Sequence, residues 1–202
     1  MRKVLSYMLI LISVTLILLP TIQDAYNGYL SNKLTSEAIE KNNYNEKFNE
    51  STNNYSSVYY EYKELRDCYN EDLHDKNVLL IIDKIDFKQI VLEGASEDNL
   101  KISVASIYGK GKPGEGNYCI AGHRSKYFGK NFNRILEIKK SDKIKVLSDN
   151  KIYEYKVCDV FKVKPEEIWV LNQSDKAEIT LISCYPMYNP QWRIIVKGSL
   201  TE

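Results

Sequence analysis

Cys184 ends a strand-like run and is the side chain best placed for covalent chemistry. The run reads ITLISC over 179–184, and period-two alternation puts Thr180, Ile182 and Cys184 on one face. A thiol at a strand end can act as a nucleophile, whereas a thiol within a strand most often fills a core position. The attacking species is the thiolate, and an ordinary thiol has a pKa of about 8.5. A reactive cysteine therefore needs a proton acceptor or a cation nearby.

One of the two histidines in the chain can meet that need. His123 ends a second strand-like run, NYCIAGH over 117–123, which follows the chain-reversing segment 112–116. His74 lies in a polar, helix-like stretch and is interpreted as a solvated surface residue. His123 is the candidate for proton transfer.

Arg193 belongs to a third strand-like run, over 192–196. Alternation puts Arg193, Ile195 and Lys197 on one face of the strand. From there the Arg193 guanidinium can reach the end of the neighbouring strand that carries Cys184. Arginine stays protonated, and its donors suit a tetrahedral oxyanion or a substrate carbonyl. Taken singly, the three candidates have ordinary structural interpretations, as a core cysteine, a loop histidine and a surface arginine.

Taken together, Ala121-Gly122-His123, Thr180-Leu181-Ile182-Ser183-Cys184 and Arg193 resemble the signature of the sortase family of cysteine transpeptidases. The family's usual string before the nucleophile is Thr-Leu-x-Thr-Cys. Ser183 replaces the second threonine here and keeps a small hydroxyl. The resemblance covers residues 77 to 200, the length of one domain.

The resemblance implies an enzyme that cleaves a Leu-Pro-x-Thr-Gly-like sorting motif of surface proteins between threonine and glycine. Cys184 would be the nucleophile and carry the acyl group as a thioester. His123 would hold a proton and deliver it to the leaving amine, and Arg193 would bind the oxyanion. The acyl group would then pass to an amine of a peptidoglycan precursor or to another amine acceptor on a Gram-positive cell.

The resemblance also implies a substrate groove beside the strand that carries Cys184. The loop 163–171 is expected to form its wall, and Ala121 and Ile182 its floor. The apolar wall residues expected to meet the leucine and proline of the motif are Ile168, Trp169 and Val170.

The four cysteines admit other interpretations. Cys68, Cys119, Cys158 and Cys184 form an even set, so a disulfide that removes the nucleophile is an alternative, although the spacings match no disulfide framework. A zinc site is disfavoured because the chain has no Cys-x-x-Cys pair and no second core histidine. Cys119 and Cys158 are interpreted as core residues.

No cofactor is expected. Some sortases use calcium to order the groove loop, and acidic residues are available here, but their spacing does not resemble a calcium loop. These residues are Glu115, Glu166 and Glu167.

The segment 109–114 lacks the Gly-Lys-Ser/Thr ending of a phosphate-binding loop and is interpreted as a turn. The net charge of +1, without a basic stripe, argues against a nucleic-acid partner.

An uncharged apolar segment near the N-terminus predicts a membrane anchor over residues 1–22. The stretch 4–19 follows Arg2 and Lys3, and no small-x-small cleavage site follows it, so we expect a retained single-pass helix rather than a cleaved signal peptide. The positive-inside rule puts the N-terminus in the cytoplasm and the catalytic domain outside the cell.

Residues 23–76 are rich in asparagine and tyrosine and predict a helical stalk. Its clearest signal is an aromatic stripe at three- to four-residue spacing, from Tyr55 to Tyr69. The stripe is expected to pack on the catalytic domain, with the membrane surface and self-association as alternatives.

Residues 77–202 predict a mainly β catalytic domain. Short strand-like runs alternate with turn signals, as in a sandwich or barrel, and the resemblance selects a closed eight-stranded β-barrel with short helices. The runs span 78–82, 89–92, 117–122, 143–147, 152–164, 178–184 and 192–197, and the helical pieces lie near 98–102 and 132–136.

Loop lengths favour a class A- or D-like sortase. The chain lacks the Asp-Pro-aromatic lid of pilus-building sortases, and the segment 165–177 is too short for the long helix of the haem-anchoring class. Two alternatives remain open: a pilin-polymerising sortase, and a catalytically silent sortase-fold module that only binds peptides.

Overall fold

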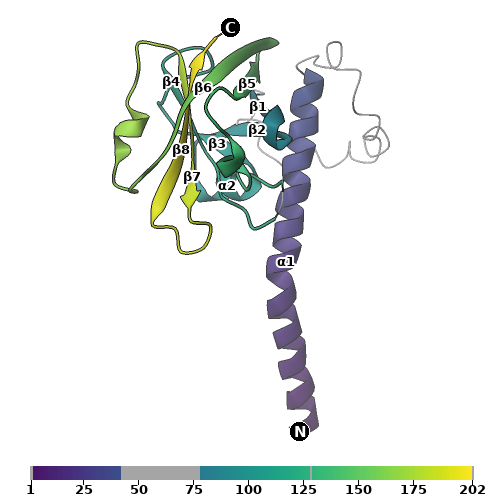
Figure 1. Cartoon of the computed structure of the whole chain (residues 1–202). Helices are drawn as coiled ribbons and strands as arrows, with labels where there is room; N and C mark the ends of the chain where they lie inside the picture. Colours follow the sequence, from purple (N-terminus) through teal and green to yellow (C-terminus); the bar gives the residue numbers. More distant parts are fainter. Residues whose placement is uncertain (1, 42–77, 128, 202) are drawn as a thin grey trace.

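The computed structural model describes residues 2–41, 78–127 and 129–201 (Figure 1). Its elements are α1 (Arg2–Lys41), β1 (Val78–Ile82), η5 (Asp83–Ile85), β2 (Phe87–Glu93), α2 (Glu97–Ile102), β3 (Val104–Ser106), β4 (Asn117–Ala121), η6 (Ile135–Glu137), β5 (Lys143–Ser148), β6 (Lys151–Val163), η7 (Ile168–Leu171), β7 (Glu178–Tyr185) and β8 (Trp192–Leu200).

The eight strands close into a barrel in the order β1-β2-β3-β4-β7-β8-β6-β5. The β2–β3 and β4–β7 pairs are parallel, and the other pairs are antiparallel. The predicted barrel is therefore confirmed. Seven strands coincide within a few residues with the predicted runs, and the unpredicted strand is β3, whose three residues are too short for alternation to be recognised.

Alternation along the strands divides the barrel interior from its outer surface. The interior is filled by side chains such as Tyr118 and Ile120 of β4, Leu181 of β7 and Val196 of β8. Residues at the alternate positions of each strand face outward. On β4, β7 and β8 these positions include the motif residues Ala121, Cys184 and Arg193. The candidate site is thus built on the outside of one barrel rim, on strands held by a packed core.

Helix α1 runs without a break from the apolar segment into the part of the chain expected to form the stalk. Its C-terminal part lies against β1, β2 and α2. Leu34 and Ala38 are buried there with Leu79 and Ile90, and the Thr35 hydroxyl accepts a hydrogen bond from the Ile90 N–H at 3.1 Å. The aromatic stripe from 55 to 69 and His74 lie outside the described residues.

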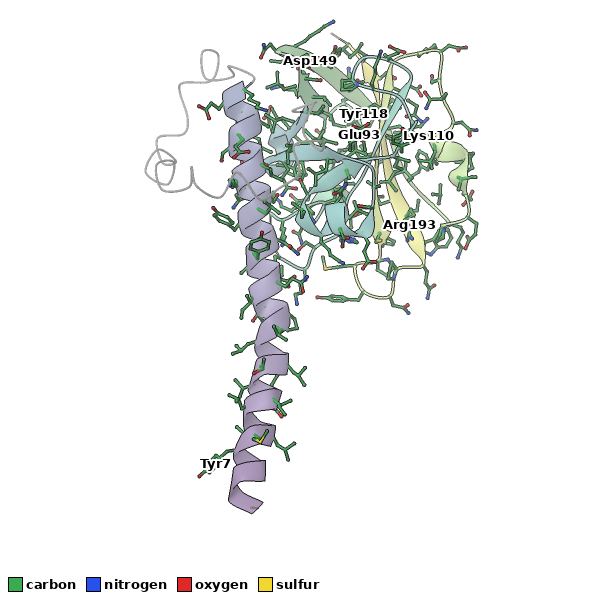
Figure 2. All side chains as sticks on the ribbon, turned by 180° about the vertical axis from the view of Figure 1, so that it is seen from behind. Tyr7, Glu93, Lys110, Tyr118, Asp149 and Arg193 are labelled. Atoms are coloured by element: carbon green, nitrogen blue, oxygen red, sulfur yellow. The ribbon has the colours of Figure 1, made fainter. Side chains whose placement is uncertain are left out.

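The N-terminal half of α1 projects away from the barrel (Figure 1). The end of β7 and the loop that leads to β8 point in the same direction as this half of the helix. Figure 2 shows Arg193 at this end of the barrel and Asp149 at the opposite end. The rim that carries the candidate catalytic residues is therefore the one that faces the apolar part of α1.

Candidate active site

Cys184, His123 and Arg193 lie at the ends of three adjacent strands. Cys184 of β7 pairs directly with Arg193 of β8 in the antiparallel ladder. Ala121, the last residue of β4, pairs with Ile182 in the parallel β4–β7 ladder, so His123, two residues further, leaves its strand level with Cys184. The structure thus brings the three residues, which are distant in sequence, to one rim.

The strand ends that carry His123 and Cys184 are bonded to each other. The Gly122 N–H donates to the Ile182 carbonyl at 3.0 Å, and the buried Ser183 hydroxyl donates to the Gly122 carbonyl at 2.8 Å. A Cβ at Gly122 would lie 2.6 Å from the Phe132 ring, so this position requires glycine for close packing. The motif residues beside the histidine and the cysteine therefore fix the distance between the two strand ends.

Cys184 is half-buried and has a free thiol. Cys119 is also free but fully buried, and burial raises the pKa of its thiol to about 11. The interpretation of Cys158 as a core residue is wrong: it lies at a bulge of β6 between Val157 and Asp159 and is exposed, and its thiol lies 3.3 Å from the Lys197 carbonyl. Among these three cysteines, only Cys184 combines solvent access with a position beside a histidine-bearing strand. Cys68 lies outside the described residues.

His123 is exposed at the rim, and its backbone carbonyl accepts a hydrogen bond from the Phe132 N–H at 3.0 Å. Partial desolvation lowers the pKa of its imidazole below the usual 6.5, Lys101 lowers it further, and Glu97 opposes the change. The imidazole is therefore mostly neutral at pH 7 and can accept a proton.

Arg193 is half-buried beside Cys184, and its Nη1 donates to the Trp192 carbonyl at 3.2 Å. This bond holds the guanidinium along its own strand at the rim. An arginine has several further N–H donors, which can meet an oxygen that carries developing negative charge.

A tyrosine that the sequence analysis did not single out connects the strands at this rim. Two cations lie over the ring of Tyr185, the residue directly after Cys184: the Lys162 Nζ is 3.7 Å and the Arg124 Cζ 5.7 Å from its centroid. Arg124 directly follows His123, and the Lys162 ammonium lowers the pKa of the Tyr185 hydroxyl. The signal in the sequence was that Tyr185 and Arg124 each directly follow a candidate catalytic residue, whereas nothing in the sequence marked Lys162.

The residues expected to form the groove floor lie at the outward-facing positions of β4 and β7, and those expected to form its wall lie in η7, between β6 and β7. Ala121 and Ile182 are paired and half-buried. In η7, Ile168 and Trp169 are 69% and 49% exposed, whereas Val170 is 4% exposed. Val170 packs with Val163 and Ile195 beneath the loop, so its side chain anchors the wall rather than facing solvent.

Further contacts hold this loop in place. The side-chain amide of Asn117 donates to the carbonyls of Val170 and Asn172, both at 2.9 Å, and the Trp169 ring stacks on Phe161 with centroids 5.7 Å apart. Thr180, from the strand-end motif, donates to Asn117 Oδ1 at 2.6 Å. The motif on β7 therefore also supports the loop beside the groove.

Two of the three acidic residues considered for calcium, Glu115 and Glu167, are engaged locally. Glu115 pairs with Lys112 at 2.8 Å, and Glu167 accepts from the Lys164 N–H at 2.7 Å and from the Trp169 indole at 3.4 Å. Within residues 2–41, 78–127 and 129–201, no group of three or more histidine, cysteine or acidic side chains gathers as a metal site.

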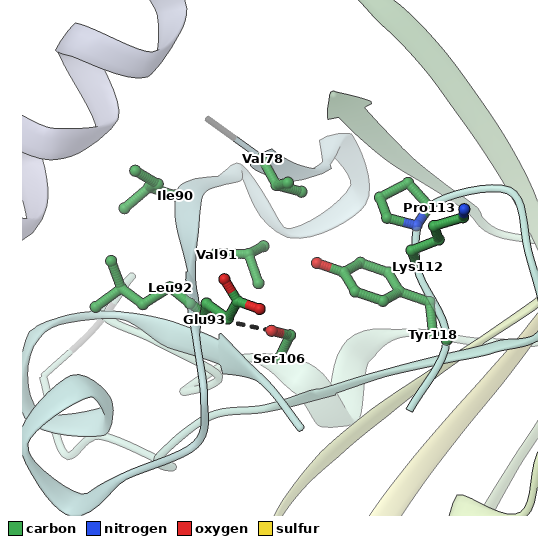
Figure 3. A pocket seen from close by; sticks show the side chains of 10 residues that line it. Val78, Ile90, Val91, Leu92, Glu93, Ser106, Lys112, Pro113 and Tyr118 are labelled. Carbon is green, nitrogen blue, oxygen red and sulfur yellow. Dashed lines mark hydrogen bonds between the residues drawn. The ribbon is translucent and has the colours of Figure 1, made fainter. Parts of the chain in front are cut away.

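Two cavities lie at different places on the molecule. One, of about 210 Å³, opens between α1 and the loop after β4, and its lining includes His123, Asp24 and Lys130. The other lies beside β2, β3 and the segment before β4, where the Tyr118 hydroxyl points toward Val91 (Figure 3). None of the three candidate catalytic residues lines this second cavity.

Comparisons with known proteins agree on one family. A sortase-domain family model matches residues 80–201. Sortase A of Bacillus anthracis is 32% identical over 180 residues, which cover 87% of this chain and 84% of that protein. Sortase A of Listeria monocytogenes is 27% identical over 209 residues, covering 100% and 92%. The solved structure of a Clostridium perfringens sortase D5 transpeptidase superposes with a TM-score of 0.65 at 28% identity and covers 87% of this chain and 100% of that one.

Proposed function

The chain belongs to the sortase family, and we propose that it is a membrane-anchored cysteine transpeptidase with Cys184, His123 and Arg193 as its catalytic residues. Its donor substrates are surface proteins with a Leu-Pro-x-Thr-Gly-like motif, and its acceptor is a cell-wall amine such as that of a peptidoglycan precursor. The observation that carries the proposal is the direct pairing of Cys184 with Arg193, with His123 two residues beyond the end of β4, the strand that pairs with β7.

In the first half-reaction, the Cys184 sulfur attacks the threonine carbonyl carbon and the thiol proton passes to His123. The neutral imidazole suits this step because a protonated one could not accept the proton. The Arg193 guanidinium stabilises the oxyanion of the tetrahedral intermediate. The bond between threonine and glycine then breaks, and His123 gives its proton to the leaving glycine amine.

In the second half-reaction, an acceptor amine attacks the thioester carbonyl and loses a proton to His123. The Cys184 sulfur leaves and takes that proton back, so the enzyme returns to its starting state and a new amide bond has formed. Ala121, Ile182, Ile168 and Trp169 contact the bound motif, and Val170 supports the wall from below.

The N-terminal half of α1 is the proposed anchor. It is the one helix in the described part of the chain that is long and apolar enough to cross a membrane. With Arg2 and Lys3 on the cytoplasmic side, a single crossing puts the barrel outside the cell, where its substrates are.

The test is cleavage of a fluorogenic Leu-Pro-x-Thr-Gly peptide by the full chain in detergent, with an amine acceptor present. Cys184→Ala is expected to lower kcat by about 10³-fold or more. The matched control is Cys158→Ser, which changes an exposed thiol away from the rim and is expected to leave turnover within about two-fold. Equal turnover by Cys184→Ala and the unaltered chain would rule out the proposal, and peptide binding without turnover by the unaltered chain would favour a silent binding module.

A further inference from the structure

Helix α1 is not a free tether, because its C-terminal part is packed into the barrel surface. Leu34 and Ala38 are 7% and 0% exposed, and both belong to a buried cluster with residues of β1 and β2. The Thr35 hydroxyl adds a bond to the β2 backbone at Ile90. Since one continuous helix carries both the apolar segment and these contacts, the docking sets which end of the barrel lies toward the apolar segment. Pro20, inside the helix, lacks an N–H donor and is the point at which the tilt of the barrel against the membrane can change.

The loop after His123 lies level with the end of the apolar segment. The Tyr127 hydroxyl is 3.3 Å from Asp24 Oδ2, and the Lys130 Nζ is 3.4 Å from the Asp24 carbonyl. Asp24 is the first acidic residue after the apolar stretch and lies two residues beyond Ile22, which is about 3 Å along a helix. A headgroup layer is about 5–7 Å deep on each side of a bilayer, so this loop falls within it when α1 spans the membrane.

The whole catalytic rim lies on this side of the barrel. Figure 1 shows the end of β7 and the β7–β8 loop pointing along the projecting half of α1, and Figure 2 shows Arg193 near that end. The β7–β8 loop exposes Tyr188, which is 74% accessible. A bilayer around the apolar segment would therefore meet the rim and not the opposite end near Asp149.

The residue types at this rim suit a membrane surface. Tyrosine is enriched at bilayer interfaces, where its ring lies at the headgroup level. A lysine ammonium near the surface is attracted to anionic lipid phosphate. Lys126 lies 5.0 Å above the Tyr127 ring, and both residues are exposed. Lys101 nearby is paired with Glu97 and Asp98. In the loop after His123 the lysines are Lys126 and Lys130, and the Lys130 ammonium contacts an uncharged backbone carbonyl of Asp24. Among the described residues, Asp24 is the one acidic residue that lines the cavity shared by these two lysines.

We propose that docked α1 holds the catalytic rim against the membrane surface, and that Lys126 and Lys130 bind anionic phospholipid headgroups of the bilayer that α1 crosses. The inference rests on the proposed role of α1 as an anchor and does not depend on catalysis by Cys184. If the rim lies at the membrane surface, the active site receives substrates whose sorting motif lies close to the lipid headgroups.

The experiment measures energy transfer from a dye on the barrel to acceptor dyes on lipid headgroups. The full chain carries serine at Cys68, Cys158 and Cys184, and the dye is attached through Tyr188→Cys at the rim or through Lys151→Cys, the first residue of β6, at the opposite end. Vesicles contain phosphatidylglycerol or phosphatidylcholine alone. Co-flotation with the vesicles is checked first, because it tests the anchor separately from the orientation.

We expect energy transfer from position 188 to be at least about three-fold more efficient than from position 151, because the length of the barrel separates the two sites. Equal transfer from the two positions in protein that floats with the vesicles would overturn the orientation. Peptide cleavage by the unaltered chain is measured in parallel, so a failure of the proposed function is distinguishable from a failure of this inference.

The lipid contact is tested by reversing charge. In phosphatidylglycerol vesicles, Lys126→Glu with Lys130→Glu is expected to lower transfer from position 188 at least about two-fold, and the effect should shrink in phosphatidylcholine. The matched control is Lys151→Glu with Lys176→Glu, two exposed lysines at the opposite end, which should leave transfer unchanged. Equal thermal melting of the variants verifies folding. An equal effect in both lipids, or none, would overturn headgroup binding.

Discussion

Cys184 and Arg193 lie directly opposite each other across the β7–β8 ladder. If the guanidinium binds the oxyanion, Arg193→Ala should lower kcat/KM for a sorting peptide by about 10²–10³-fold. Arg193→Lys keeps the charge but not the planar fork and should recover part of that loss. Steady-state kinetics of the two variants measure the effect, and an alanine variant that retains full kcat would remove Arg193 from the mechanism.

The lowered pKa of His123 predicts the acid limb of the pH profile. A base loses its function when it is protonated, so activity should persist as pH falls to 6.5 and decline only below it, near the lowered pKa. The profile of kcat/KM measures this midpoint, and titration of the imidazole by NMR in Cys184→Ala assigns it. A midpoint above pH 6.5 would contradict the account.

The Ser183 hydroxyl is predicted to hold the two catalytic strand ends together through its 2.8 Å bond to the Gly122 carbonyl. Ser183→Ala leaves a buried carbonyl without that donor and should lower the free energy of unfolding by about 1–3 kcal/mol, together with kcat/KM. Ser183→Thr keeps the hydroxyl and should retain most of both. Chemical denaturation and peptide kinetics make the comparison, and equal values for all three proteins would show that the bond has no role.

The Tyr185 ring is predicted to position the end of β6 and the loop after His123 through its contacts with Lys162 and Arg124. Tyr185→Phe keeps the ring face and should keep most of the activity, whereas Tyr185→Leu removes the cation–π contacts, worth about 0.5–2 kcal/mol, and should lower kcat more than it raises KM. A change mainly in kcat indicates that the ring positions the catalytic groups, and a change mainly in KM indicates that it binds substrate. Similar losses in both variants would assign the effect to the hydroxyl instead.

Much of the barrel could be predicted because seven strands are long enough to show alternation between turns. Strand β3 could not, since its three residues are recognisable only through their pairing with β2 and β4. The sequence carries a weak signal for the docking of α1, because Leu30, Leu34 and Ala38 are spaced four residues apart on one helix face. The spacing alone does not say which surface covers them.

The candidate catalytic residues could be recognised because they belong to local motifs at strand ends. The contacts of Tyr185 could not, because its partners Lys162 and Arg124 come from other strands and loops that only barrel closure brings together. The same holds for Asn117, whose bonds to the loop before β7 span more than fifty residues of sequence. The burial of Val170 likewise depends on Val163 and Ile195 of two other strands.

The most direct test of the central claim is mass spectrometry of the full chain incubated with a small library of sorting peptides in the absence of an amine acceptor. We expect a covalent adduct with the mass of the peptide acyl group, mapped by proteolysis to Cys184, which is released when an amine is added. Product formation in Cys184→Ala, or an adduct that maps only to Cys158 or Cys119, would contradict it.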